Sequence, residues 1–223
     1  MTRVKLCGIT NERDIDICAK AGVHVLGFVV AYPVPVPWNL TPERARELIE
    51  SVPPFIQTCV VTGGEVDKIL DIAALTRPNL VQLHYRESLA EIAEMARSLK
   101  QQGMKTIKAL RINSDGRCDF EIPDPAIAAK ALSKSGISAI LADSYTETMP
   151  GGTGVAVELR TFRRIKKESS LPVILAGGLN PANIENIVRE AQPYAVDILT
   201  GAEESPGHKN PDKINRLMAA VCR

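Results

Sequence analysis

Eight short apolar runs alternate with longer amphipathic segments along the chain. The runs are rich in β-branched residues and mostly lack apolar–polar alternation, which is typical of strands buried on both faces of a parallel sheet. The pattern therefore predicts eight strands, at Val4–Cys7, Val23–Val30, Phe55–Val61, Leu80–His84, Thr106–Leu110, Ile137–Ala142, Val173–Ala176 and Ala195–Leu199.

The segments between the runs carry apolar residues at positions i, i+3, i+4 and i+7, the spacing of an amphipathic helix. They predict eight helices, of which those near 125–134 and 158–167 have weaker patterns. Ser88 and Glu91 have the spacing of a capping box. Four further pairs place a capping residue before a proline at the expected first helical position, namely Thr41-Pro42, Asp124-Pro125, Asn180-Pro181 and Asn210-Pro211.

The strict alternation of strands and helices predicts the fold class. Dividing 223 residues by eight gives about 28 residues per unit, close to the size of a strand–helix crossover. Eight similar units favour an α/β fold, a single (β/α)8 TIM barrel with residues 1–223 as one domain. The alternative, a doubly wound open sheet, usually has a Gly-x-Gly-x-x-Gly turn after its first strand, which Cys7-Gly8-Ile9-Thr10 lacks.

Charge and cysteine content restrict the partners. The formal net charge is +1, from 27 Lys and Arg against 26 Asp and Glu, so the balance favours neither a nucleic acid nor a membrane surface. No apolar run has the length of a signal-peptide core or a membrane span. Five cysteines without a Cys-x-x-Cys pair argue against a disulfide framework and a zinc site, so we expect no metal and a cytoplasmic location.

Polar or reactive residues occur inside several apolar runs or directly after them. Residues two apart share one face of a strand, so Lys5 and Cys7 point the same way. Barrel enzymes place their chemistry at the carboxyl ends of the strands, where these groups lie. The alternative is a structural ion-pair layer, with His84 as a structural histidine. The residues are Lys5, Cys7, Gln82, His84, Lys108, Asp143 and Asp197.

Cys7 ends the first strand and precedes both a glycine and the start of a helix near Asn11. Helix N-termini and nearby cations lower the pKa of a thiol toward the range of a useful base. We therefore expect the pKa of Cys7 to be lowered. The alternative is that Cys7 is a small buried hydrophobic residue, as free cysteines commonly are.

Three glycine-rich turns follow the last three expected strands, at Gly151–Gly154, Ala176–Leu179 and Leu199–Gly201. Glycine lets the backbone approach a ligand closely and aim N–H groups at it. Barrels frequently bind phosphate with the loops after strands seven and eight. The turns therefore predict a phosphate site near the C-terminal part of the chain.

The order of these motifs is similar to that of a known family. The matching segments are Lys5–Thr10, Gly27–Val29, Thr41–Glu43, Gln82–His84, Leu141–Ser144, Gly151–Gly154, Leu175–Asn183, and Asp197 with Gly201. Over nearly its whole length the chain resembles the phosphoribosylanthranilate isomerases of the tryptophan pathway. The resemblance implies an Amadori rearrangement, in which a small phosphosugar substrate, a phosphoribosyl-amine, becomes a 1-deoxy-ketose phosphate without a cofactor.

The resemblance also implies roles for single residues. Cys7 matches the family's general base, which takes the C2′ proton, and Asp143 matches the general acid, which protonates the ribose ring oxygen. The matching phosphate site consists of Gly152, Gly154, Gly177, Gly178, Thr200 and Gly201. The expected substrate-binding residues are Lys5, Trp38, Gln82, His84 and Asp197.

The match breaks after the second strand. The family has Ser-x-Arg shortly before its Thr-Pro, where the arginine holds the anthranilate carboxylate, whereas this chain has Val36-Pro37-Trp38. Losing a bidentate carboxylate–arginine pair predicts low activity on the anthranilate substrate and a gain from Trp38→Arg. Either another cation, Arg86 or Arg111, replaces the arginine, or the substrate has changed.

Two other functions and the assembly stay open. A regulatory barrel would bind the phosphosugar without catalysis, and a Schiff-base aldolase would use Lys5 or Lys108 as its nucleophile. The oligomeric state is either monomer or homodimer, because the apolar segment Tyr32–Trp38 either closes over a ligand or forms a subunit contact.

Overall fold

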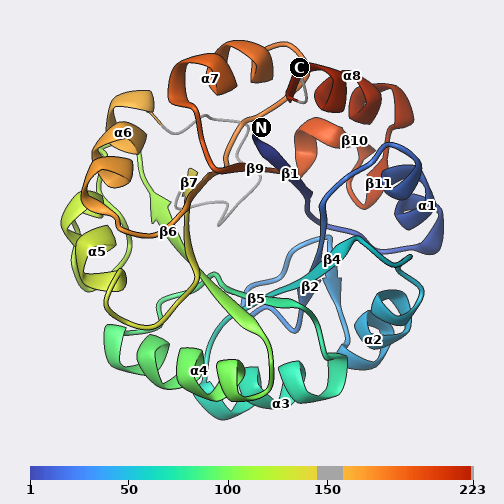
Figure 1. The fold of residues 1–223 in the computed structure, drawn as a ribbon. Helices are drawn as coiled ribbons and strands as arrows, with labels where there is room; N and C mark the ends of the chain where they lie inside the picture. Colours follow the sequence, from blue (N-terminus) through green and yellow to red (C-terminus); the bar gives the residue numbers. More distant parts are fainter. Residues whose placement is uncertain (145–157, 222–223) are drawn as a thin grey trace.

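The computed structural model describes residues 1–144 and 158–221 of the chain. Eight parallel strands form a closed ring, because β1 pairs with β2 on one side and with β9 on the other (Figure 1). The predicted (β/α)8 barrel is thus confirmed, with each strand within two residues of its expected bounds. These strands are β1 (Arg3–Leu6), β2 (Val25–Val30), β4 (Gln57–Thr62), β5 (Leu80–Leu83), β6 (Lys105–Ile112), β7 (Ala139–Ser144), β8 (Val173–Leu175) and β9 (Ala195–Ile198).

Helices surround the ring of strands on its outside (Figure 1). Every amphipathic segment forms a helix, including the two weaker ones, which are α5 and α6. The helices are α1 (Glu12–Lys20), α2 (Pro42–Glu50), α3 (Val66–Thr76), α4 (Leu89–Gln101), α5 (Pro125–Leu132), α6 (Leu159–Glu168), α7 (Ile184–Ala191) and α8 (Pro211–Val221).

Helix starts follow the capping residues. Thr41 and Asp124 accept hydrogen bonds from first-turn N–H groups of α2 and α5, and Asn210 does so for α8. Ser88 and Glu91 form both hydrogen bonds of the capping box at α4. These side chains satisfy N–H groups that have no partner within their own helix, which fixes where each helix begins.

The start of α7 is an exception to the prediction. The sequence placed Pro181 at the first helical position, but α7 begins at Ile184. The side-chain oxygen of Asn180 accepts from the N–H of Ala182, and Asn183 accepts in turn from the N–H of Asn180. Asn180 therefore forms a tight turn that precedes the helix, a competing use of asparagine that the Asn-Pro signal does not distinguish.

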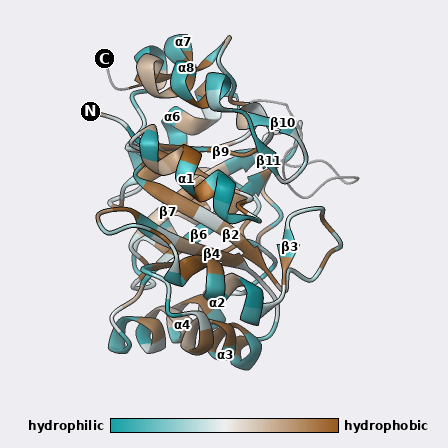
Figure 2. Ribbon diagram, turned by 90° about the vertical axis from the view of Figure 1, so that its right-hand side faces the viewer, coloured by the Kyte–Doolittle hydropathy of each residue, from teal (hydrophilic) through white to brown (hydrophobic). Residues whose placement is uncertain are grey.

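Side chains along β1 alternate between two layers. Val4 and Leu6 are fully buried in the apolar layer that includes the inner faces of α1 and α8. Cys7 belongs instead to the cluster inside the barrel, and Lys5 pairs across the barrel strands with Asp197 of β9. Figure 2 shows the strands as a mainly hydrophobic band between helices with hydrophilic outer faces. The predicted common orientation of Lys5 and Cys7 is confirmed.

Short elements that the hydrophobic pattern did not predict lie at the carboxyl end of the barrel. They are β3 (Asn39–Leu40), the 3-10 helix η1 (Thr200–Ala202), and the antiparallel pair β10 (Glu203–Ser205) and β11 (His208–Lys209). Figure 2 shows β3 and the β10–β11 pair on the same side of the molecule. Elements of two or three residues are too short to show a period, so only the structure reveals that they surround the barrel mouth.

Candidate active site

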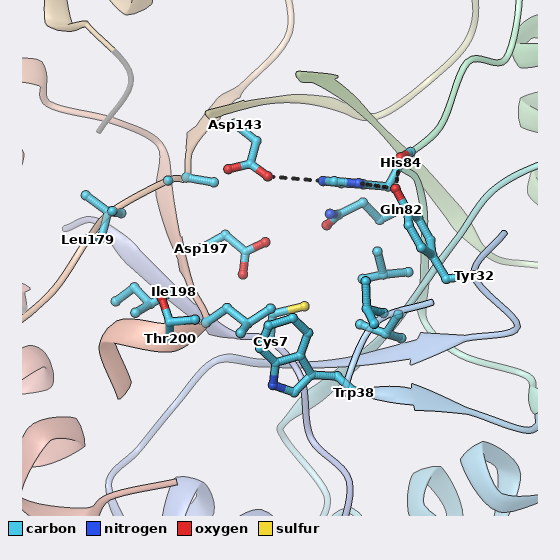
Figure 3. A pocket seen from close by; sticks show the side chains of 17 residues that line it. Cys7, Tyr32, Trp38, Gln82, His84, Asp143, Leu179, Asp197, Ile198 and Thr200 are labelled. Carbon is cyan, nitrogen blue, oxygen red and sulfur yellow. Dashed lines mark hydrogen bonds and ion pairs between the residues drawn. The ribbon is translucent and has the colours of Figure 1, made fainter. Parts of the chain in front are cut away.

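A cavity opens at the carboxyl end of the barrel, where small-molecule sites of this fold lie (Figure 3). Lys5 does not line the cavity, but it pairs with Asp197, which does. Gly201 lies in η1 directly after the lining residue Thr200. Gly152 and Gly154 lie outside the described residues. The predicted site residues that line the cavity are Cys7, Trp38, Gln82, His84, Asp143, Gly177, Gly178, Asp197 and Thr200.

Lys5 and Asp197 form a buried ion pair next to Cys7. The Lys5 Nζ lies 2.6 Å from the Asp197 Oδ2, and the two residues are register partners of β1 and β9. Burial, the largest single effect, opposes the positive charge on Lys5. The Asp197 carboxylate, together with the Cys7 and Cys59 sulfurs, outweighs it and leaves the pKa of Lys5 above its ordinary value. A Schiff-base nucleophile must be a neutral amine, so this pair argues against Lys5 as one.

Lys108 lies behind the cavity wall and does not line the cavity. Its ammonium group donates to the Glu87 carboxylate at 2.5 Å and to the Tyr85 carbonyl at 2.8 Å, with both charged side chains fully buried. Burial lowers the pKa of Lys108, and the Glu87 carboxylate opposes that shift. Lys108 is therefore part of a buried ion pair and not in reach of a substrate in the cavity.

Gly27 of β2 makes room for the Cys7 thiol. A Cβ at Gly27 would lie 2.8 Å from the Cys7 Sγ and 3.0 Å from the Lys5 Nζ. Burial raises the pKa of Cys7, although the ammonium groups of Lys5 and Lys209 lower it in part. The expectation of a lowered pKa is therefore wrong, because the loss of hydration, together with the nearby Asp197 carboxylate, exceeds the effect of the two cations.

The raised pKa of Cys7 predicts how its alkylation depends on pH. The thiolate is the form that reacts, so iodoacetamide should modify Cys7 at a rate that still increases above about pH 8.5, the ordinary thiol value. Mass spectrometry of the Cys7 peptide against time measures this rate. A rate that reaches its plateau below about pH 8 would contradict the raised pKa.

His84 connects Asp143 to Tyr32, a residue that the sequence did not single out as a site residue. The Nε2 atom of His84 lies 3.2 Å from the Asp143 Oδ2, and its Nδ1 lies 3.2 Å from the Tyr32 hydroxyl (Figure 3). The Tyr32 hydroxyl also donates to the His84 carbonyl at 2.8 Å. Tyr32, Val36 and Trp38 all line the cavity, so their segment covers the ligand space.

Trp38 belongs to a second buried network at the mouth. Its indole N–H donates to Glu203 at 2.9 Å, and Glu203 also accepts from the Lys209 ammonium at 2.8 Å. Lys209 donates further to the Cys7 carbonyl at 2.6 Å. A Cβ at Gly8 would lie 2.8 Å from the indole, so this glycine admits the ring. The network fixes Trp38 with its carbon atoms toward the cavity and ties it to Cys7.

The glycine turns after β8 and β9 form another part of the wall. Gly177 and Gly178 have φ angles of +85° and +59°, values that glycine adopts without strain. A Cβ at Gly177 would overlap the Ser144 side chain, and one at Gly201 would overlap the Leu179 carbonyl. These positions bring backbone, without side chains, to the end of the cavity beside Thr200.

No Lys or Arg lines the cavity within residues 1–144 and 158–221. Both arginines considered as replacements lie beside Asp119, where Arg111 forms an ion pair and Arg86 lies 3.9 Å from the carboxylate. The described residues also contain no cluster of three or more metal-ligating side chains, and none of their helices is long and apolar enough to span a bilayer.

The fold and this site define a (β/α)8-barrel protein with a candidate acid–base pair at the mouth of its cavity. The profile of the N-(5′-phosphoribosyl)anthranilate isomerase family matches residues 4–220, and the chain belongs to this family. A relative so named from Chlorobium phaeobacteroides is 36% identical over 100% of this chain and 98% of its own.

Solved structures agree with this assignment. One phosphoribosylanthranilate isomerase, in complex with reduced 1-(o-carboxyphenylamino)-1-deoxyribulose 5-phosphate, has a TM-score of 0.78 and 29% identity, over 100% of this chain and 99% of its own. A second structure shows monomers generated from the dimeric phosphoribosylanthranilate isomerase of Thermotoga maritima. It has a TM-score of 0.79 and 28% identity, over 100% of this chain and 99% of its own. The family expected from the motif order is confirmed.

Proposed function

We propose that the protein converts N-(5′-phosphoribosyl)anthranilate into 1-(o-carboxyphenylamino)-1-deoxyribulose 5-phosphate by an Amadori rearrangement. The observation that carries the proposal is that Cys7 and Asp143 face one cavity from opposite sides (Figure 3). General acid–base catalysis of this reaction needs one proton donor and one acceptor on different sides of the sugar. Membership of the family supports the same reaction.

The two residues have complementary tasks in the proposed mechanism. Asp143 gives its carboxyl proton to the ribose ring oxygen while the bond from that oxygen to C1′ breaks, which leaves a protonated imine. The thiolate of Cys7, a minor form at neutral pH because burial raises the pKa of this thiol, then takes the proton from C2′. The C–H electron pair forms the C1′–C2′ double bond of an enolamine. The enolamine gains a proton at C1′ and loses one from its 2′-hydroxyl, which gives the ketose.

Other lining groups suit the remaining parts of the substrate. We propose that the turns with Gly177, Gly178, Thr200 and Gly201 bind the phosphate, since such turns aim backbone N–H groups at anions. Two buried oxygens of the cavity wall, one each on Gln82 and Asp197, have no hydrogen-bond partner among the described residues. These two atoms are suited to accept hydrogen bonds from sugar hydroxyls.

Direct turnover tests the proposed reaction. The purified protein is mixed with freshly generated N-(5′-phosphoribosyl)anthranilate, and NMR follows the appearance of the ketose product with its C1′ methylene group. We expect product far above the rate in buffer alone. Binding of the phosphosugar without product would instead support the regulatory barrel. Borohydride trapping with a pentose phosphate should leave the protein unlabelled, because the Lys5 ammonium is charged.

The cavity wall around Trp38 predicts that the enzyme hardly distinguishes a substrate with the anthranilate carboxylate from one without it. We expect kcat/KM for the anthranilate substrate to be within about fivefold of that for the aniline analogue without the carboxylate, since no cation of the described residues lines the cavity. Trp38→Arg should raise this ratio about 10- to 100-fold, because a hydrogen bond to a charged group contributes about 1.5–3 kcal/mol.

The control for this prediction is Trp38→Phe, which keeps an apolar wall and adds no charge. Its ratio should remain close to that of the unchanged protein. If the unchanged protein itself prefers the anthranilate substrate by about 100-fold or more, another group binds the carboxylate and the prediction is wrong.

We also propose that the protein is a homodimer that works in the cytoplasm without a nucleic-acid partner. Phe55, in the loop after α2, is fully exposed and has a φ of +73°, a strained conformation for a non-glycine residue. An exposed phenyl ring held in this way suits insertion into a second copy, and the Thermotoga maritima relative is described as dimeric. The near-neutral charge supports the absence of a nucleic-acid partner.

Light scattering tests the homodimer. The unchanged protein should have the mass of two chains at micromolar concentration, and Phe55→Asp should have the mass of one, because the buried charge would be unpaired. Phe55 does not line the cavity, so kcat should change less than about threefold. A monomeric unchanged protein would contradict the proposal.

A further inference from the structure

The hydrogen bonds around Tyr32 determine which nitrogen of His84 carries a proton. The Tyr32 hydroxyl has one proton and two acceptors within reach, the His84 carbonyl at 2.8 Å and the His84 Nδ1 at 3.2 Å. Burial raises the pKa of Tyr32 to about 12, so the phenol keeps this proton at neutral pH. The shorter distance assigns the proton to the carbonyl, an acceptor with no proton of its own.

The lone pairs of the same hydroxyl oxygen are then available to donors. Arg111 Nη1 approaches this oxygen to 3.4 Å, and the Nδ1 of His84 is its other neighbour. If Nδ1 carries a proton, every contact of the Tyr32 hydroxyl is a hydrogen bond. If Nδ1 is bare, two acceptors compete for one proton and one of them remains unsatisfied in a buried site, which is costly.

We propose that Tyr32 is a positioning residue that holds neutral His84 as the Nδ1–H tautomer and thereby keeps Asp143 protonated. With Nδ1 protonated, the Nε2 of neutral His84 is a bare acceptor. Its 3.2 Å contact with Asp143 Oδ2 is then a hydrogen bond only if Asp143 supplies the proton. Which imidazole nitrogen is protonated is set by the partner of the other, and here that partner is Tyr32.

The charged groups around this chain of contacts are compatible with the neutral form. Asp197 of β9 faces the same cavity but is already paired with Lys5 of β1. Arg111 of β6, next to Tyr32, is paired with Asp119. On the segment after β5, Glu87 is paired with Lys108. Asp143 of β7 is the acid that contacts the imidazole, and transfer of its proton to His84 would create two buried charges from none.

This inference rests on the proposed function only for its catalytic meaning. An Asp143 that carries its proton before the substrate binds is ready to protonate the ring oxygen. Once the proton has left, the carboxylate oxygen faces the bare Nε2, a contact between two lone pairs. That contact destabilises the carboxylate and favours its reprotonation by water before the next turnover.

Nitrogen NMR tests the tautomer without reference to activity. The chain has three histidines, so ¹⁵N-histidine labelling gives few signals, and a His84→Gln variant identifies those of His84. We expect a protonated Nδ1 and a bare Nε2 at about pH 7 in the unchanged protein, near the ordinary value for histidine. In Tyr32→Phe the proton should move to Nε2. A protonated Nε2 in the unchanged protein, as the other tautomer or as imidazolium, would overturn the proposal.

The pH dependence of kcat gives the second readout. In Tyr32→Phe, an Nε2–H donor stabilises the Asp143 carboxylate, so the acid form is lost at lower pH. The ratio of kcat between the unchanged protein and the variant should therefore be close to one near pH 5 and grow to about tenfold near pH 8. A purely structural role of Tyr32 would give a ratio that does not change with pH, and this result would also overturn the proposal.

Tyr85→Phe is the matched control. The Tyr85 ring packs edge-on against Tyr32 at 6.3 Å, so the variant removes a neighbouring phenol of the same kind. Its His84 signals and its kcat profile should equal those of the unchanged protein. If the protein turns over no phosphosugar at all, the proposed function fails, whereas the NMR experiment still decides the tautomer.

Discussion

Cys7→Ala lowers kcat for N-(5′-phosphoribosyl)anthranilate by about 10²- to 10⁴-fold, the usual contribution of a general base. Cys7 lines the cavity from the end of β1, and Gly27 leaves room for its thiol beside Lys5. No other thiol of the described residues lines this cavity. The residual rate should reflect substrate orientation by the remaining cavity wall. Steady-state kinetics of the purified variant measures the loss.

Cys59→Ala is the matched control for this variant. Cys59 is a fully buried cysteine of β4 in the same interior cluster as Cys7, but it does not line the cavity. Its removal should change kcat by less than about threefold while costing stability as any small core truncation does. Equal losses in the two variants would mean that Cys7 acts through packing, and the base would then have to be another residue.

The barrel and the location of its candidate site could be predicted because the signals are periodic and local. An apolar run that lacks alternation indicates a strand buried on both faces, and eight such runs with helices between them leave few topologies. Lys5 and Cys7 are two residues apart on one strand, so their shared face follows from the pleat alone. Asp143 and the glycine turns after β8 and β9 follow from their places at strand ends.

Other features depend on contacts between distant parts of the chain, and no local pattern encodes them. Trp38 meets Glu203 across 165 positions of sequence, and Tyr32 meets His84 across 52. The sequence marked the Tyr32–Trp38 segment as a departure from the family and as a ligand cover or subunit contact, but it indicated neither of these two partners. The pKa of Cys7 illustrates the same limit, because the cations were visible in sequence while the extent of burial, which outweighs them, was not.

One half of the cavity, with Cys7 and Asp143, matches the pattern expected of the family, whereas the half with Trp38 departs from it. The half with Cys7 and Asp143 has the groups that the family match predicts, so the reaction type follows from it. The half with Tyr32 and Trp38 has no lining cation among the described residues. Tyr32 of this half contacts His84, and His84 in turn contacts Asp143. If both proposals hold, one segment influences the aglycone wall through Trp38 and the acid through Tyr32 and His84.

Asp143→Asn lowers kcat by about 10²- to 10⁴-fold, because an amide cannot give a proton to the ring oxygen as the ring opens. The fold should tolerate the change, since the amide is nearly the same size and its N–H can donate to the His84 Nε2 now 3.2 Å from Asp143. The melting temperature and the KM for the substrate should therefore change little.

The open-chain analogue, reduced 1-(o-carboxyphenylamino)-1-deoxyribulose 5-phosphate, separates acid catalysis from binding. It has no ring oxygen to protonate, so Asp143→Asn should bind it within about fivefold of the unchanged protein, which calorimetry can measure. A loss of analogue binding as large as the loss of kcat would show that Asp143 holds the ligand equally before and after ring opening. That outcome would assign Asp143 to binding and leave His84, the other titratable group in contact with it, as the candidate proton donor.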